Sequence, residues 1–341
     1  MSEVLKMLKD ISKTKPITFL PGTRKLVFIE EANATYVLED ILKASAEALG
    51  KGIFGTCYKA TLENGNIVVV RRLRDLVVTL EDFQYHMEMF GMMRHENVAQ
   101  VRAYYFSGDE KLAVYDYYDQ GSVFALLHGN RGRTDRTPLD WESRMRIAVG
   151  AARGVAHIHR NDGQKLVHGN IKSTSIFLGR QNYGIVSDAG LAKLSGPIRL
   201  SPGYCATEVT DTASVSQASD IYSFGVLLLE LVTRKQPYQV TRDDGEVSSL
   251  VNLIESVGRD EWTEVIDAEL LRDETEEEIM AQLLQIAMYC ISFVPEHRPR
   301  MSEVLRMLED ISGIEPESGD QVSIESRFEY LLEGLLFTLT P

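Results

Sequence analysis

The sequence has few cysteines and no long hydrophobic run. Its three cysteines, Cys57, Cys205 and Cys290, are far apart in a chain of 341 residues. Because their number is odd and their spacing fits neither a disulfide framework nor a metal site, we expect a reducing compartment. The most apolar stretch, Gly225–Val232, is short and contains Glu230. We therefore predict no direct membrane insertion.

Positive charge is also scarce. The chain has 36 lysines and arginines against 50 aspartates and glutamates, which gives a formal net charge of −14. This excess of acid argues against nucleic acid or an anionic membrane surface as the main partner. The first ten residues lack the hydrophobic stretch of a signal peptide, and Ser2 stands where N-myristoylation requires glycine. These absences favour a cytoplasmic protein.

A twelve-residue segment occurs twice in the chain, at 1–12 and at 301–312. The copies differ at two positions, Lys6 against Arg306 and Lys9 against Glu309. Each copy has the apolar spacing of an amphipathic helix, but twelve residues are too few for a repeat architecture. We interpret the first copy as the tail end of a duplicated unit.

The rest of the composition is that of a globular protein, with 44% hydrophobic and 25% charged residues. We predict an N-terminal helix and linker over 1–35, with a short strand at Lys25–Glu30. The main domain is predicted over 36–312. The remainder, 313–341, is predicted to be an acidic tail with a terminal helix.

A glycine-rich stretch opens the main domain. Gly50, Gly52 and Gly55 form the pattern G-x-G-x-x-G, and two predicted strands joined by a turn follow, at 56–61 and 67–72. A dinucleotide-binding fold would instead place a helix after the glycines. The hairpin favours a loop that covers phosphate groups, and a glycine-rich hairpin without a ligand is the alternative.

Two polar turns follow in the second half of the chain, within 166–178 and 185–191. Their residues resemble the H-R-D-L-K-x-x-N and D-F-G motifs of protein kinases. Four positions match these motifs: His168, Lys172, Asp188 and Gly190. Four others do not match them: Gly169, Asn170, Ser175 and Ala189.

The resemblance to kinases covers about 36–312 and looks closest to the intracellular domain of plant leucine-rich-repeat receptor-like kinases. It implies an α+β fold of two lobes. The small lobe, about 36–117, would have five strands and one long helix, and the larger lobe, about 118–312, would be mainly helical. The resemblance also implies that Asp220 holds the backbone of the loop at His168, and that Glu208 pairs with Arg298.

The same resemblance implies a site for ATP in the small lobe. Its residues would be Gly50, Gly52, Gly55, Cys57, Val69, Arg71, Glu88 and Tyr115. Arg71 takes the place of the strand lysine, and its planar fork positions phosphate differently. We expect Glu88 to be the partner of Arg71, and Met92, one turn further along the helix, to face the core.

The catalytic positions depart most from the family pattern. Asn170 replaces the catalytic aspartate, and a neutral amide cannot accept a proton at neutral pH. General-base catalysis is worth about 10²–10⁴-fold. Ser175 replaces a metal-binding asparagine, whereas Asp188 and Lys172 are kept. Ala189 replaces a phenylalanine that would pack beside His168, a loss of roughly 3–5 kcal/mol unless neighbours fill the gap.

These substitutions predict an inactive kinase that works by binding in plant receptor-kinase signalling. Its expected partners are receptor-like kinases or their substrates, which would recruit it to the plasma membrane. Binding of ATP and Mg²⁺ is expected to be weak or absent. Two alternatives remain open. One is a weak serine/threonine kinase that uses Lys172, Asp188 and Arg71, and the other is a duplicated fragment without a settled function.

Overall fold

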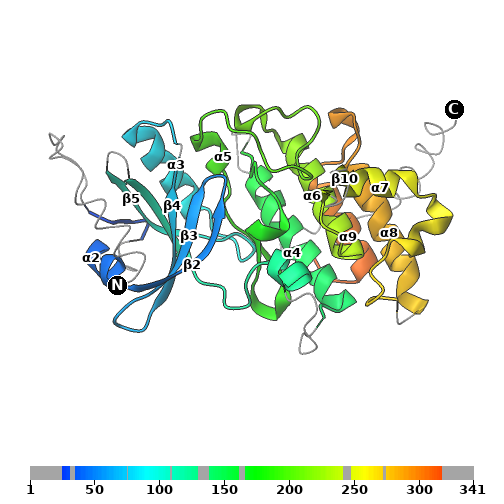
Figure 1. Ribbon diagram of the computed structural model, residues 1–341, viewed down its shortest axis with the longest axis horizontal. Coiled ribbons are helices and arrows are strands. Elements are labelled where there is room, and N and C mark those ends of the chain that lie inside the picture. The colour runs from blue at the N-terminus through cyan, green and yellow to red at the C-terminus, as the bar shows by residue number, and fades with distance from the viewer. Residues whose placement is uncertain are drawn as a thin grey trace.

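The computed structural model describes residues 25–30, 35–74, 76–107, 110–129, 138–160, 166–240, 247–271 and 274–316. The helices predicted at 1–12 and near the C-terminus lie outside these ranges. The described chain folds into two lobes, a β-sheet lobe and a helical lobe (Figure 1). This is the predicted α+β arrangement.

The small lobe contains six strands rather than the predicted five. They are β1 (Val27–Phe28), β2 (Ser45–Gly52), β3 (Gly55–Thr61), β4 (Ile67–Leu73), β5 (Val101–Ser107) and β6 (Glu110–Asp116). The order is β1-β5-β6-β4-β3-β2, and all neighbours are antiparallel. The additional strand is β1, which pairs with β5. The sheet thus extends into the segment predicted as a linker, where a short strand was expected.

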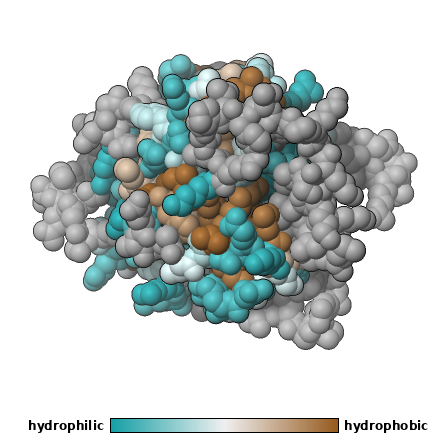
Figure 2. Space-filling model, turned by 90° about the vertical axis from the view of Figure 1, so that its left-hand side faces the viewer, coloured by the Kyte–Doolittle hydropathy of each residue, from teal (hydrophilic) through white to brown (hydrophobic). Residues whose placement is uncertain are grey.

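Two helices cover opposite faces of this sheet, α2 (Leu38–Lys43) and α3 (Leu80–Met92). Side chains alternate along β4, so Val68 and Val70 pack with Ile41 of α2, while Leu73 packs with α3. Alternation of this kind follows from the two-residue period of a strand. Figure 2 views the small lobe end-on. Hydrophobic residues gather in the middle of the molecular surface seen there, among hydrophilic ones. Because Leu73 belongs to the core cluster that includes the large lobe, the odd positions of β4, including Arg71, face the second lobe.

The large lobe is built around two long helices, α4 (Trp141–Arg160) and α6 (Gln217–Thr233). The other α-helices described there are α5 (Leu191–Leu194), α7 (Leu250–Ser256), α8 (Glu274–Cys290) and α9 (Met301–Ser312). Two hairpins are formed by β7 (Ile176–Leu178) with β8 (Gly184–Val186), and by β9 (Tyr238–Val240) with β10 (Val247–Ser249). Shorter helical turns are η2 (Ala125–Gly129), η3 (Ser173–Ser175), η4 (Arg180–Asn182), η5 (Thr212–Ser214), η6 (Arg259–Glu264) and η7 (Pro295–His297). In the part of the chain described, no helix is long and apolar enough to span a membrane.

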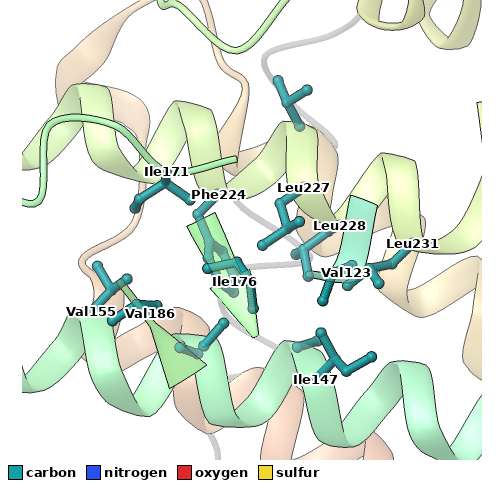
Figure 3. Packing of buried hydrophobic residues seen from close by; sticks show 14 of the residues in the cluster. Val123, Ile147, Val155, Ile171, Ile176, Val186, Phe224, Leu227, Leu228 and Leu231 are labelled. Atoms are coloured by element: carbon teal, nitrogen blue, oxygen red, sulfur yellow. The ribbon is translucent and has the colours of Figure 1, made fainter. Parts of the chain in front are cut away.

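The loop that carries the candidate site is anchored in the core of this lobe. Ile171 and Ile176 are almost fully buried at its two ends. Figure 3 shows both side chains between α4 and α6, close to Phe224 of α6 and Val155 of α4. Burying an aliphatic side chain is worth about 1.5–3 kcal/mol. The polar residues between the two isoleucines are therefore held on a rigid base.

Candidate functional site

Asp220 holds the backbone of the loop at its start. Its carboxylate accepts hydrogen bonds from the amides of His168 at 2.7 Å and Gly169 at 2.8 Å. His159 lies 2.9 Å from the same carboxylate. Asp220 sits in the first turn of α6, so the long buried helix fixes the loop. The contact predicted for Asp220 is present.

A second predicted contact joins Glu208 to Arg298. The guanidinium donates two hydrogen bonds to the carboxylate, at 2.6 Å and 2.9 Å. Arg298 also lies over the ring of Tyr222, 5.1 Å from its centroid. Bidentate pairs of this kind are among the stronger hydrogen-bonded contacts in proteins. The ion pair fixes the end of the segment that follows the site.

Arg71 pairs with Asp188 across the two lobes. One terminal nitrogen of the guanidinium lies 2.6 Å from Oδ2 of the carboxylate, and the two side chains are 12% and 6% exposed. Burial lowers the pKa of Arg71 and the carboxylate of Asp188 raises it, with a net increase. The guanidinium therefore stays charged. Each buried charge of the pair depends on the other.

Glu88 is not the partner of Arg71, which corrects the prediction. Glu88 is exposed, and its carboxylate accepts a hydrogen bond from the Tyr104 hydroxyl at 3.1 Å. The side of α3 that faces the site carries His86 instead. Two positions along a helix are about 200° apart, so Glu88 points away when His86 points in. The error was one of helical register.

His86 and Phe90 of α3 pack against the turn at Gly190. A Cβ atom on Gly190 would lie 2.9 Å from the His86 ring and 2.3 Å from the Phe90 ring. The two rings lie against each other with centroids 4.6 Å apart. Among the residues that the structure describes, the buried Nε2 of His86 has no hydrogen-bond partner. Burial lowers the pKa of His86 to about 4, so the imidazole is neutral at neutral pH.

An aromatic ring of the small lobe lies beside the turn that contains Ala189. The ring of Phe90 takes the space beside the Asp188–Gly190 turn, and Ala189 packs against the core as a half-buried residue. Met92, which was expected to face the core, is 66% exposed. The interlobe contact is therefore closed by an aromatic ring on α3 rather than by one on the turn. Sequence analysis missed both His86 and Phe90.

Ser175 is turned into its own loop. Its hydroxyl oxygen lies 3.1 Å from the carbonyl oxygen of Asn170 and 2.9 Å from that of Lys172. It also accepts a hydrogen bond from the Lys172 amide at 3.2 Å. The buried hydroxyl thus closes the turn η3 and is not directed at a ligand. Asn170 is buried as well, and its backbone N–H donates a hydrogen bond to Nδ1 of His168 at 3.2 Å.

These contacts do not suit Mg²⁺, which requires oxygen ligands in near-octahedral arrangement. Of the two predicted metal ligands, Ser175 is engaged with backbone carbonyls and Asp188 with a guanidinium. Within the described ranges, no group of three or more His, Cys, Asp or Glu residues could hold a metal ion.

Lys172 brings a second positive charge close to the pair. Its ammonium group lies 3.4 Å from the Ser201 hydroxyl. Burial lowers the pKa of Lys172, Asp188 raises it and Arg71 lowers it again, with a net decrease. A second cation thus lies within electrostatic reach of the carboxylate that Arg71 contacts. The positive charges of Lys172 and Arg71 could bind a phosphate group without a metal ion.

Cys57 and Tyr115, two residues of the predicted nucleotide site, are uncharged. Cys57 lies opposite Arg71 on β3, and Tyr115 lies opposite Val69 on β6. Burial raises the pKa of the Cys57 thiol to about 11. Burial, followed by Asp188, also raises the pKa of Tyr115 above its ordinary value. Both side chains therefore stay protonated at neutral pH.

The glycines lie at the turn between β2 and β3, and the hairpin predicted at 56–61 and 67–72 is formed by β3 and β4. Gly55 has a φ of +134°, and a Cβ atom there would lie 1.9 Å from the carbonyl oxygen of Arg72. This position therefore requires glycine. Gly50 has open space around its missing Cβ, and Gly52 nearly so. Their predicted role in covering a phosphate stays a prediction.

Comparison with known proteins identifies the family of this chain. Residues 44–308 match the family described as protein tyrosine and serine/threonine kinase. A protein of Arabidopsis thaliana named "probable inactive receptor kinase" is 53% identical over 302 residues, which are 86% of this chain and 47% of that protein. The chain spans about half the length of the first curated relatives that it matches.

Two solved structures share the fold. One is the pseudokinase domain of BIR2, described as an immune regulator of the RLK/Pelle family, which is 29% identical with a TM-score of 0.72 over 85% of this chain and 90% of that one. The other is the maize SIRK1 kinase domain bound to AMP-PNP, 27% identical with a TM-score of 0.73 over 84% and 99%. The fold, the motif positions and these matches show that the chain belongs to the protein kinase family, among the receptor-like kinases.

Proposed function

We propose that this chain is a catalytically inactive receptor-like kinase, acting as a binding or allosteric partner in plant receptor-kinase signalling. The observation that carries the proposal is the buried ion pair between Arg71 and Asp188. In an active kinase the equivalent aspartate holds Mg²⁺ and the equivalent strand residue, a lysine, holds phosphate. Here each neutralises the other.

A metal ion at Asp188 would have to displace this guanidinium. Breaking a buried pair by removing one partner costs about 3–5 kcal/mol, because the other charge is left without compensation. Ser175 offers no second ligand, since its hydroxyl is held by the loop. Bound ATP would supply the phosphoryl group, and Arg71 and Lys172 would hold its phosphates. We expect binding of ATP with Mg²⁺ to be weak or absent.

Proton transfer is the second missing step. The substrate hydroxyl must lose its proton in phosphoryl transfer, and Asn170 stands at the position of the accepting aspartate. Its neutral amide cannot take that proton. The scaffold contacts of Asp220 and of Glu208 with Arg298 are meanwhile intact. Losses that concentrate at the positions of chemistry, with the fold kept, favour a function in binding.

The test is phosphotransfer from labelled ATP to the chain and to a general substrate protein. Wild type and Asp188→Asn should both give background. Transfer by wild type that disappears in Asp188→Asn would overturn the proposal. A variant with Arg71→Lys, Asn170→Asp and Ser175→Asn asks whether the scaffold still supports turnover.

A weak serine/threonine kinase is the second candidate. It is favoured by the convergence of Lys172, Arg71 and Asp188 at one place. A neighbour of the same fold has also been seen with AMP-PNP. In that case Lys172→Ala should abolish a small but measurable transfer. If neither wild type nor Lys172→Ala gives phosphotransfer above background, this candidate is excluded.

A further inference from the structure

The outward face of α3 carries an apolar stripe. Tyr85 is 59% exposed and Met92 is 66% exposed, and Met89 between them is half-buried. With 3.6 residues per turn, these three side chains leave the helix within about 60° of one another. They lie opposite the face that packs on the sheet and on the Gly190 turn. Large apolar side chains in one exposed stripe are typical of an interaction site.

Acidic residues border this stripe on both sides. Glu81, Asp82 and Glu88 are exposed, and their positions lie about 40–60° to either side of Tyr85 around the helix. The segment Leu80–Met92 contains no lysine or arginine. The face thus has an apolar centre and a rim of one charge sign. Tyrosine and methionine are enriched in the centre of protein interfaces, and polar groups form the rim.

We propose that this face of α3 binds a basic, amphipathic helix of a partner protein. The inference rests on the proposed function in so far as the chain works by binding. A partner helix would lay apolar residues at i, i+4 and i+7 over the stripe and place lysine or arginine against the rim. A second copy of this chain is disfavoured, because two acidic rims would meet and each chain carries a net charge of −14.

The experiment uses the full chain and a labelled synthetic probe. The probe is a helical peptide of about 18 residues, with leucine along one face and lysine along its edges. Fluorescence anisotropy is measured at low and high salt, since exposed charges are screened at high salt. The double variant Tyr85→Ser/Met92→Ser should weaken binding about tenfold or more, which corresponds to the loss of interface anchors. Higher salt should weaken binding to wild type.

Matched controls distinguish binding at this face of α3 from non-specific binding of the peptide. Phe293 is 76% exposed and lies outside α3, so Phe293→Ser should bind the peptide as wild type does. A peptide with glutamate in place of lysine should not bind. Thermal unfolding should show that both variants remain folded, because all three substituted residues are exposed.

Several outcomes would overturn the inference. They are equal peptide binding by the double variant, an equal loss in Phe293→Ser, and equal binding of the acidic peptide. Self-association in sedimentation that disappears in the double variant would assign the face to a second copy. None of these outcomes depends on phosphotransfer, so a catalytically active chain would overturn the proposed function and leave the peptide result standing.

Discussion

At the scale of single residues, Arg71 illustrates how one substitution changes the contacts of a site. Its guanidinium reaches a carboxylate of the other lobe and is buried with it. Arg72, the next residue of the same strand, pairs with Glu110 and is 30% exposed. The two arginines share sequence context and differ in burial. They therefore form a natural comparison.

Arg71→Gln should destabilise the protein by about 3–5 kcal/mol, because Asp188 would stay buried without a counter-charge. Arg72→Gln should cost about 0–1 kcal/mol, as expected for a pair near the surface. Urea unfolding of both variants gives the comparison. An Arg71→Gln variant as stable as Arg72→Gln would show that the ion pair does not hold the lobes together.

His86 predicts a pH dependence of stability. Its pKa is about 4 in the folded state and about 6.5 when unfolded. Between these values the unfolded chain binds a proton that the folded chain does not, so stability is lost as the pH falls from about 6.5 towards 4. The shift corresponds to about 3 kcal/mol.

The measurement is urea unfolding at a series of pH values through this window. His86→Leu should lose this part of the pH dependence, whereas His297→Gln, at an exposed site, should keep it. Equal pH dependence in wild type and His86→Leu would contradict the buried, neutral state of the imidazole.

At the scale of elements, α9 explains what separates the two copies of the repeated segment. Glu309 in α9 pairs with Arg153 of α4 at 2.9 Å, and both side chains are buried. The first copy has Lys9 at this position. A lysine there would face the buried Arg153, so the two copies are not interchangeable against α4. The other difference, at Arg306, falls on a half-buried position.

Glu309→Lys should therefore destabilise the protein by about 3–5 kcal/mol, through loss of a buried pair and an added like charge. Arg306→Lys, the other difference between the copies, should change stability by less than about 1 kcal/mol. Thermal and urea unfolding test both. Equal effects of the two substitutions would show that the contact between α4 and α9 does not discriminate by charge.

At the scale of the whole molecule, the sequence predicts contacts that motif order determines. The partners of Asp220 and Arg298 follow from the resemblance, and the structure contains them. The two-lobe architecture follows in the same way. These contacts are predictable because their positions depend on motifs in fixed order and not on a helix's rotation.

The interlobe contacts were not predictable in this way. The side of α3 that faces the site depends on rotation about the helix axis, and a shift of two residues exchanges Glu88 for His86. The partner of Arg71 depends on the reach of a guanidinium between two lobes, which the sequence does not specify. The ring of Phe90, which is distant in the sequence, packs at Gly190, next to the position where the turn lacks an aromatic residue. Each error concerns packing between elements.

The central claim is that the pair of Arg71 and Asp188 takes the place of nucleotide and metal. Thermal unfolding with and without ATP and Mg²⁺ tests it most directly, because a ligand that binds the folded state raises its stability. The account predicts little or no shift of the melting temperature in wild type. A rise of several degrees that requires both ATP and Mg²⁺ would contradict it.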